Sequence, residues 1–574
     1  MPRRTLDSLR SQRWFAPDTM RAFAHRQRTQ QMGRRREEFM GKPVIAILNT
    51  WSDLSPCHRH LRDRAEAVKR AVWAAGGYPV ELPALSLGEV MVKPTTMLYR
   101  NMLAMETEEL LRQHPVDGAV LMGGCDKTTP GLIMGALSMG LPFIFCPAGP
   151  MLNGRWRGQL AGAGTHTRKY WDAYRTGEIT RDDWIALESA MTRSVGTCNT
   201  MGTASTITSI VDAMGLTLPG ASSIPAADAG HERMCSAAGE RIVGMIWEDH
   251  APHAFLTRES FLNGAAVSMA LGGSTNAAVH IMALARRAGV DVSLADLDRL
   301  GREVPVLANI FPSGDRLMED FFFAGGLPAL MARIAPHLDL DQMTASGETV
   351  GTCIAGAEVL DDEVIRPLDR PVSGAPAMAV LTGNLAPDGA VIKPSAADPA
   401  RMTHTGPAVV FSSMADFAAR IDDPELPVTP DSVLVLQNAG PVGAPGMPEW
   451  GNLQIPRKIL AQGVRDMVRI SDARMSGTHY GTCVLHVAPE AAVGGPLALV
   501  HDGDPVTLDV PARRLTLDVD KAELDRRRAA WTPPDYSADR GWVALHRREV
   551  TQAPEGCDFP VLDRGRDQGE PEIF

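Results

Sequence analysis

Short apolar runs alternate with segments of helical spacing in the N-terminal part of the chain, and this alternation restricts the fold more than any other feature. The apolar runs cover residues 43–49, 78–82, 118–122 and 141–146. Residues 61–75 have helical spacing and precede Gly76-Gly77, a helix stop signal. Another helix is expected over residues 108–113, with Thr107 as its N-cap. Apolar strands that alternate with helices form parallel sheets, so we predict an α/β fold with an N-terminal parallel sheet.

The sequence pattern changes beyond about residue 365. Pro367, Pro371 and Pro376 interrupt a segment that we interpret as a linker. Short β-rich runs separated by Gly, Pro and Asp follow at residues 379–381, 408–411, 432–436, 505–510 and 515–519. We predict an N-terminal α/β domain of residues 1–370 and a C-terminal β-barrel-like domain of residues 371–574, with a polar, partly mobile tail from about Asp535.

One uncharged segment raises the question of a membrane span. Residues 260–285 contain no Lys, Arg, Asp or Glu and are long enough to cross a bilayer. The centre of this segment, residues 272–276, reads GGSTN and would expose polar groups to lipid. We predict two buried elements joined by a polar loop, and no membrane partner. The formal net charge of −11 argues against a nucleic-acid partner, because duplex-binding proteins usually carry a basic face.

The eight cysteines are scattered along the chain without the short spacings of a disulfide scaffold. The N-terminal sequence MPRRTLDSLRSQRWF is basic, but the apolar segment of a secretory signal does not follow it. We therefore expect reduced thiols and a cytoplasmic location. Five of the cysteines are interpreted as small buried hydrophobic residues: Cys146, Cys235, Cys353, Cys483 and Cys557.

The other three cysteines, Cys57, Cys125 and Cys198, lie in loops rich in Gly, Pro or polar residues, and the first two loops directly follow predicted strands. Ligands bind beyond the carboxyl ends of parallel strands, so these strand-end loops should lie at one edge of the sheet. Zinc sites usually have tighter Cys or His pairs than this sequence offers. Three thiolates could instead hold an iron–sulfur cluster whose open iron acts as a Lewis acid, or do redox work. The spacing alone leaves these possibilities open.

Three carboxylates and one serine are candidates for further chemistry. Glu89 and Asp126 lie in or near such loops, and Glu449 ends a turn rich in Gly and Pro. Carboxylates on separate loops suit Mg²⁺, although a single carboxylate is more commonly a solvated surface charge. Ser476 lies in the polar segment 471–481. A serine reacts only where a base, metal or cation activates it, and otherwise this segment is an ordinary polar turn.

Eight strings of the sequence together resemble the dihydroxy-acid and sugar-acid dehydratase family, which includes the phosphogluconate dehydratases. They are, in chain order, NTWSDLSPCH, GGCDKTTPG, GTCNTMGTAST, LGGSTNAAVH, TGNLAPDGAVIK, PGMPEWGN, DARMSGTHYGT and HVAPEAAVGGPLALVHDGD. They extend from residue 49 to residue 504, so the resemblance covers nearly the whole chain. It implies an N-terminal α/β domain and a C-terminal β-barrel domain, assembly as homodimers or homotetramers, and dehydration of a 2,3-dihydroxy acid to a 2-keto-3-deoxy acid.

The resemblance also implies roles for individual residues. The matches to the family's iron–sulfur ligands are Cys57, Cys125 and Cys198, and those to its Mg²⁺ ligands are Glu89, Asp126 and Glu449. Lys127 matches a lysine that is carbamylated in some members, where it completes the metal shell. Ser476 matches the proposed base, and Thr478 of the same string is a further candidate catalytic residue. The implied cofactors are Mg²⁺ and a [2Fe-2S] cluster, with [4Fe-4S] as the alternative.

Departures between the branches of the family favour one subgroup. Residues 472–478 read DARMSGT and residues 445–452 read PGMPEWGN, and both strings resemble the pentonate and hexonate dehydratases rather than the branched-chain enzymes. Glu89 stands in the string SLGE, whereas branched-chain members have Ser-Asp-Gly there. We expect a small sugar acid as substrate, an aldonate such as L-arabinonate. The alternatives are a branched-chain dihydroxy-acid dehydratase, a zinc or thiol-redox protein, and a non-catalytic sugar-acid-binding protein.

Overall fold

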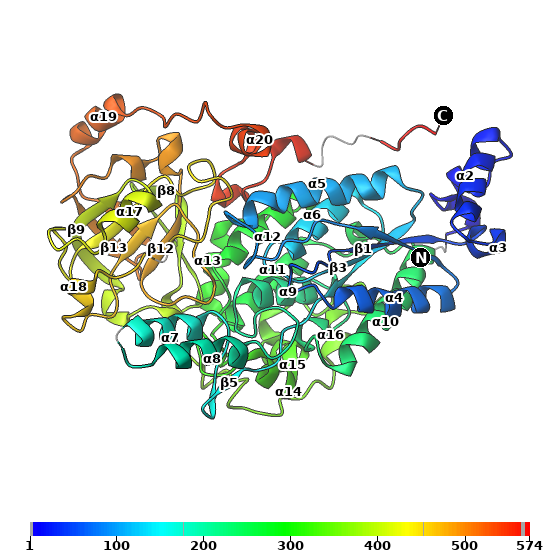
Figure 1. Cartoon of the computed structure of the whole chain (residues 1–574), viewed down its shortest axis with the longest axis horizontal. Coiled ribbons are helices and arrows are strands. Elements are labelled where there is room, and N and C mark those ends of the chain that lie inside the picture. The colour runs from blue at the N-terminus through cyan, green and yellow to red at the C-terminus, as the bar shows by residue number, and fades with distance from the viewer. Residues whose placement is uncertain (1–3, 176, 452, 564–568, 574) are drawn as a thin grey trace.

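The computed structural model describes residues 4–175, 177–451, 453–563 and 569–573. A region of helices around a parallel sheet lies beside a β-barrel, and the C-terminal segment runs from the barrel back across the helical region (Figure 1). The predicted fold class, a parallel-sheet α/β region followed by a barrel, is confirmed.

A four-stranded parallel sheet forms the centre of the N-terminal region. Its strands are β1 (Val44–Asn49), β2 (Tyr78–Pro83), β3 (Gly118–Gly123) and β4 (Phe143–Pro147), in the order β2-β1-β3-β4. Every residue of β1, β3 and β4 is buried, which explains their continuous apolar sequences. Because all pairs are parallel, the loops that follow the strands lie at one edge of the sheet, as predicted.

Helices cover both faces of this sheet. They are α5 (Met97–Gln113) and α6 (Thr128–Met139) on one face, and α4 (Leu61–Ala74) and α10 (Ala229–Trp247) on the other (Figure 1). A Cβ at Gly135 of α6 would lie only 2.3 Å from the carbonyl oxygen of Ala104 in α5, so glycine permits this close packing. The prediction that Thr107 caps a helix is wrong, because α5 begins at Met97 and Thr107 lies within it. Thr107 is buried there, as are apolar side chains on both sides of it.

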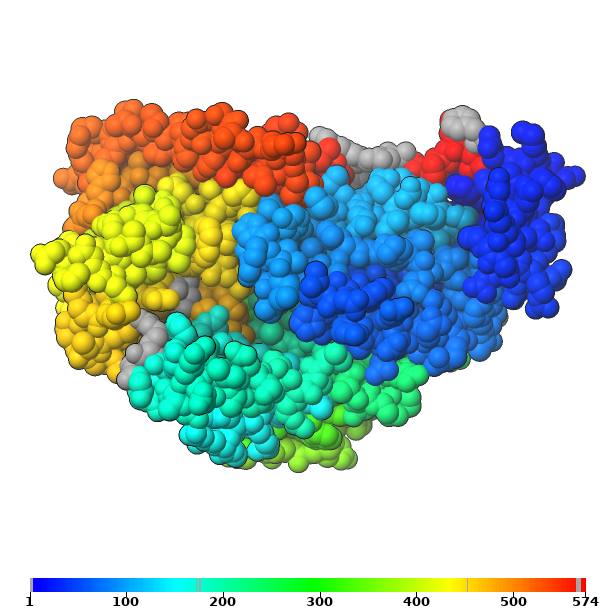
Figure 2. Space-filling model, in the orientation of Figure 1, coloured from blue at the N-terminus to red at the C-terminus, as the bar shows by residue number. Residues whose placement is uncertain are grey.

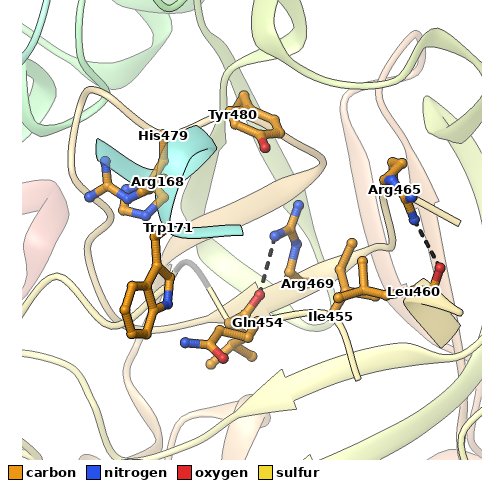
Figure 3. Close-up of a pocket in the computed structure, with 10 residues that line it drawn as sticks. Arg168, Trp171, Gln454, Ile455, Leu460, Arg465, Arg469, His479 and Tyr480 are labelled. Carbon is orange, nitrogen blue, oxygen red and sulfur yellow. Dashed lines mark hydrogen bonds between the residues drawn. The ribbon is translucent and has the colours of Figure 1, made fainter. Parts of the chain in front are cut away.

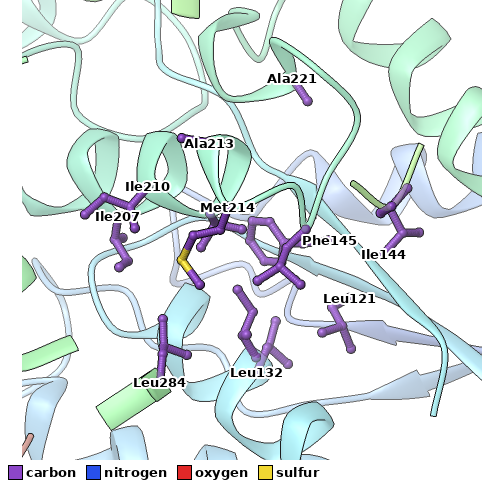
Figure 4. Packing of buried hydrophobic residues seen from close by; sticks show 14 of the residues in the cluster. Leu121, Leu132, Ile144, Phe145, Ile207, Ile210, Ala213, Met214, Ala221 and Leu284 are labelled. Atoms are coloured by element: carbon purple, nitrogen blue, oxygen red, sulfur yellow. The ribbon is translucent and has the colours of Figure 1, made fainter. Parts of the chain in front are cut away.

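The core of the N-terminal region joins the sheet to several helices (Figure 4). It includes Leu132 of α6, Phe145 of β4, Ile207 and Ile210 of α9 (Thr203–Ala213), and Leu284 of α12 (Asn276–Ala288). The uncharged segment forms α11 (Arg258–Ala270) and α12, two largely buried helices joined by a short loop, as predicted. No helix in the described part of the chain is long and apolar enough to cross a membrane.

Further elements surround this core. They are α1 (Gln12–Phe15), α2 (Met20–Gln31), α3 (Arg36–Phe39), β5 (Arg155–Trp156), β6 (Gln159–Leu160), α7 (Thr165–Arg175), α8 (Arg181–Met191), α13 (Leu294–Glu303), α14 (Met318–Phe323), α15 (Gly326–Arg333) and α16 (Val350–Ile354).

Eight strands of the C-terminal region close into a barrel, in the order β10-β11-β12-β8-β7-β14-β13-β9. Five overlap predicted β-rich runs: β7 (Ala379–Gly383), β9 (Thr403–Phe411), β10 (Val433–Leu436), β13 (Pro505–Asp509) and β14 (Arg514–Leu517). Three were missed: β8 (Ala386–Ile392), β11 (Arg469–Ser471) and β12 (Cys483–Ala488). Pro and Gly interrupt β8, β11 has three residues, and β12 is buried throughout and shows no alternation. The short helices α17 (Met414–Arg420) and α18 (Arg457–Leu460) belong to the same region.

The polar C-terminal segment includes α19 (Lys521–Ala530) and α20 (Gly541–Glu549) and then contacts the N-terminal region (Figure 1). Arg287 and Asp558 form an ion pair of 2.6 Å in which both side chains are fully buried. Arg100 donates hydrogen bonds of 2.8 Å to the carbonyl oxygens of Gly556 and Cys557. This part of the predicted mobile tail is therefore held by buried contacts, whose partners are hundreds of residues away in the sequence.

Candidate active site

The three predicted cysteines come together, two of them in loops at the carboxyl edge of the sheet and Cys198 in the segment between α8 and α9. Cys57 lies between β1 and α4, and Cys125 lies directly after β3. A hydrogen bond with Cys125, together with burial, holds the pKa of Cys57 well above its usual value, and the charge of nearby Cys198 adds to this shift. Burial, with the charges of Asp126 and Cys125, raises the pKa of Cys198 to about 12. We call Cys57, Cys125 and Cys198 the cysteine group.

His58 fixes the backbone beside the cysteine group. Burial lowers the pKa of His58 to about 3, so its imidazole is neutral. The backbone N–H of Cys125 donates to Nε2 of His58 at 3.1 Å. Because Nε2 accepts this bond, Nδ1 carries the proton and donates to Ser86 Oγ at 3.1 Å. Sequence reasoning gave His58 no role, although it stands next to Cys57.

The three predicted carboxylates converge on the ammonium of Lys127, whose side chain is fully buried. The distances from Lys127 Nζ to carboxylate oxygens of Asp126, Glu89 and Glu449 are 3.1, 3.2 and 3.3 Å. Burial opposes the charge of Lys127, but the three carboxylates outweigh it and raise the pKa of the ammonium. We call Glu89, Asp126 and Glu449 the carboxylate group.

Glu449 comes from the barrel region and is held by residues that sequence reasoning missed. Arg474 donates to Glu449 Oε1 at 3.1 Å and to the carbonyl oxygen of Met447 at 2.8 Å, and Asn276 donates to the same Oε1 at 3.0 Å. Burial opposes the charge of Glu449, but Lys127 and Arg474 outweigh it and lower its pKa. Membership of the strings DARMSGTHYGT and LGGSTNAAVH was the only sequence signal for Arg474 and Asn276.

Glu89 joins the site although its string departs from the branched-chain pattern. The hydroxyl of Thr95 donates to Glu89 Oε1 at 3.2 Å, and the hydroxyl of Thr96 donates to Oε2. Its backbone N–H points to Cys125 Sγ at 3.5 Å. Burial raises the pKa of Glu89 in spite of the opposing charge of Lys127.

Ser476 and Thr478 form a hydrogen-bonded pair in the loop between β11 and β12. Their hydroxyl oxygens are 3.0 Å apart. Arg168 of α7 donates to Thr478 Oγ1 at 2.8 Å, and the hydroxyl of Thr165 donates to the carbonyl oxygen of Thr478 at 2.8 Å. Two residues of the N-terminal region therefore fix the serine loop of the barrel. Arg168 was not predicted from the sequence.

Comparison with known protein families gives two consecutive matches. Residues 42–353 match the N-terminal part, and residues 363–557 the C-terminal part, of the dihydroxy-acid/6-phosphogluconate dehydratases. The chain belongs to this family. It is therefore a dehydratase, that is, a hydro-lyase, as the resemblance of its eight strings implied.

Several curated relatives cover nearly the whole chain. A protein named 6-deoxy-6-sulfo-D-gluconate dehydratase from Pseudomonas putida is 64% identical over 572 residues, which are 99% of each chain. An L-arabinonate dehydratase from Rhizobium leguminosarum bv. trifolii is 48% identical over 556 residues, 96% of each chain. A dihydroxy-acid dehydratase from Methanosarcina barkeri is 37% identical over 536 residues, 90% of this chain and 94% of the relative. Identity is thus higher to these two relatives named for sugar acids than to this one named for dihydroxy acids.

The donors at the site suit the two cofactors that the resemblance implies. Thiols are the ligands of iron–sulfur clusters, and oxygen atoms gathered around one cation are the ligands of Mg²⁺. Among the described residues, however, no three His, Cys, Asp or Glu side chains form a ready-made metal site. In the carboxylate group, we attribute the absence of a ready-made metal site among the described residues to Lys127, because its ammonium contacts all three carboxylates. The donor chemistry fits, and the ligand and base roles of these residues stay predictions.

Proposed function

We propose that the protein dehydrates an aldonate to its 2-keto-3-deoxy acid. The observation that carries this proposal is that Cys125, Asp126 and Lys127, three consecutive residues, join the cysteine group to the carboxylate group. In this proposal the cysteine group holds a [2Fe-2S] cluster and the carboxylate group holds Mg²⁺. When bound, these cofactors supply Lewis-acid polarisation of the carboxylate and hydroxyl oxygens of the substrate.

Ser476 is the proposed base that takes the proton from C2 of the substrate. Arg168 donates to Thr478 Oγ1, so the Thr478 hydroxyl can direct its own proton to Ser476 Oγ. A donated hydrogen bond stabilises the alkoxide form of the serine. As the C2–H bond breaks, the C3 hydroxyl leaves with its bonding electrons, and the resulting enol tautomerises to the 2-keto acid.

Lys127 has a second proposed state. Its ammonium balances the carboxylate group as the structure has it. Carbamylation of Nζ would replace this cation with a carboxylate and add an oxygen ligand among the other three. Intact-protein mass spectrometry in bicarbonate buffer tests this state.

The names of the relatives guide the choice of substrates. The relative at 64% identity is named for a six-carbon acid with a sulfonate at C6, and the relative at 48% identity is named for L-arabinonate. We propose these two acids as candidate substrates. Dihydroxy acids of branched-chain synthesis are the alternative, supported by relatives of lower identity. We also propose a homodimer or homotetramer in the cytoplasm, and light scattering of the purified protein tests the oligomeric state.

A substrate panel on anaerobically purified protein tests the proposed function. The panel contains L-arabinonate, D-gluconate, 6-deoxy-6-sulfo-D-gluconate and 2,3-dihydroxyisovalerate, and semicarbazide detects the 2-keto acid formed. We expect product from at least one aldonate. Product from 2,3-dihydroxyisovalerate alone would show the branched-chain alternative to be correct. No product from any compound, with iron and sulfide present by analysis, would contradict the proposal.

A further inference from the structure

A cavity of about 280 Å³ adjoins the serine loop of the barrel. Arg168 and Trp171 of α7 line one side, and residues 453–480 of the barrel region line the other. Figure 3 shows Arg168 and Trp171 on one side, Arg465 on the other and Arg469 between them. In the space-filling view the surface is hollowed between the cyan segment that contains α7 and the yellow barrel (Figure 2). Arg168 belongs both to this cavity and to the site described above.

The cavity carries excess positive charge. Three arginines line it, and no Asp or Glu is among its described lining residues. Arg469 is balanced by Asp466, whose carboxylate lies 2.7 Å from its guanidinium. Arg168 and Arg465 form no ion pair in the described part of the chain; Arg465 donates to the carbonyl oxygen of Leu460 at 2.9 Å. Burial lowers the pKa of Arg168 to about 10, although the charge of Glu449 opposes this shift.

The cavity lies beside the loop that carries the proposed base. Arg168 lines it and also bonds to Thr478, which contacts Ser476. The next two residues, His479 and Tyr480, line it as well. Nδ1 of His479 is buried and has no hydrogen-bond partner among the described residues. Arg168 therefore connects the loop of the proposed base with the side of the cavity that α7 lines.

We propose that this cavity binds the far end of the substrate and selects an aldonate whose terminal carbon carries a tetrahedral oxyanion, a sulfonate or a phosphate. The inference rests on the proposed function. The planar fork of an arginine matches the geometry of such an oxyanion, and charge-assisted hydrogen bonds are stronger than neutral ones. A terminal hydroxyl would leave the excess charge of the cavity without a counter-charge.

Arg465 provides the sharpest test, because it lines the cavity and does not touch the cysteine group, the carboxylate group or Ser476. Arg465→Gln removes the charge and Arg465→Lys keeps it. Arg457→Gln is the matched control: Arg457 is also exposed, lies on the neighbouring helix α18, pairs with Asp422 at 3.4 Å and does not line the cavity. The probes are 6-deoxy-6-sulfo-D-gluconate, 6-phospho-D-gluconate and D-gluconate, which differ only at C6.

In the unmodified enzyme we expect kcat/KM to be at least about tenfold higher for the sulfonate or the phosphate than for D-gluconate. Arg465→Gln should raise KM for the preferred anionic probe about tenfold, leave D-gluconate unchanged, and be partly rescued by Arg465→Lys. Of the sulfonate and phosphate probes, the one whose KM rises more in Arg465→Gln identifies the oxyanion that the cavity prefers. Equal kcat/KM for all three probes, or an equal loss with all three in Arg465→Gln, would overturn the inference.

Calorimetric titration separates this inference from the proposed function. If none of the panel compounds is dehydrated, the proposed function fails, but the anionic probes should still bind more tightly than D-gluconate, and Arg465→Gln should remove that difference. If aldonates are dehydrated and the anionic probes bind no better than D-gluconate, the proposed function stands and the anion subsite does not exist.

Discussion

The two halves of the candidate site are built in different ways. In the sheet half, loops that follow buried strands carry Cys57, Cys125, Asp126 and Lys127, and the charges there are largely balanced within the protein. In the barrel half, hydrogen bonds between distant segments position the loop that carries Ser476, and the adjoining cavity keeps unbalanced arginines. In the function that we propose, the sheet half holds the cofactors, whereas the barrel half orients a base and an anionic substrate.

The largest expected effect comes from the sheet half. Cys125→Ser removes one thiol of the cysteine group and should abolish both activity and the visible absorption of the iron–sulfur cluster, because thiolates are the ligands of such clusters. Iron analysis and an absorption spectrum measure the result. Cys483→Ser is the control, since Cys483 is a buried cysteine of β12 outside the group, and it should keep its colour. A coloured, active Cys125→Ser enzyme would show that the sheet half does not hold the cluster.

The corresponding change in the barrel half should separate chemistry from cofactor binding. Ser476→Ala removes the proposed base, and a positioned base typically contributes about 10²–10⁴-fold to the rate. We therefore expect kcat to fall by this factor while the absorption spectrum stays unchanged. Ser189→Ala, at an exposed position of α8, serves as control. If the Ser476→Ala enzyme retains near-normal kcat, the base must come from the sheet half and the division of roles is wrong.

The sequence predicts the two halves to different extents, because the interactions that build them span different distances along the chain. The sheet strands are continuous apolar runs, and Cys57 and Cys125 lie in loops that follow two of them, so local pattern was sufficient to place these two cysteines at one edge of the sheet. Their predicted role as ligands came from the resemblance. The barrel half depends on pairs such as Arg168 with Thr478, which are 310 residues apart. Nothing in the sequence around Arg168 indicates a partner on a distant loop. For the same reason the resemblance supplied Ser476, while Arg168, Arg474 and Asn276 were recognised only in the structure.

The buried carboxylate of Asp472 should make the stability of the barrel half depend on pH. Asp472 accepts hydrogen bonds of 2.9 Å from the backbone N–H groups of Ala439 and Ala491, and burial, with the charge of Glu490, raises its pKa to about 7. Because this folded-state pKa lies above the unfolded value, the proton stabilises the fold at low pH. That contribution is lost as the pH rises through about 7, and between about pH 5 and pH 8 it amounts to about 3 kcal/mol.

Asp472→Asn cannot lose a proton, so the free energy of unfolding should depend less steeply on pH in this variant. Urea titrations across that pH range measure the slope. Asp525→Asn, which changes an exposed carboxylate of α19, should leave the slope of unfolding free energy against pH as it is in the unmodified protein. Identical slopes in Asp472→Asn and the unmodified protein would mean that Asp472 is charged throughout and does not respond to pH.

The smallest effect is expected where the two halves meet. Thr478→Val removes the hydroxyl that lies between Arg168 and Ser476 but keeps the shape of the side chain. The loss of one hydrogen bond to the alkoxide should lower kcat about tenfold, with little change in KM and none in the absorption spectrum. Thr478→Ser restores the hydroxyl and should recover most of the rate. If Thr478→Val instead raises KM and leaves kcat unchanged, the contact across the two halves serves substrate binding, and the serine is activated from the sheet half alone.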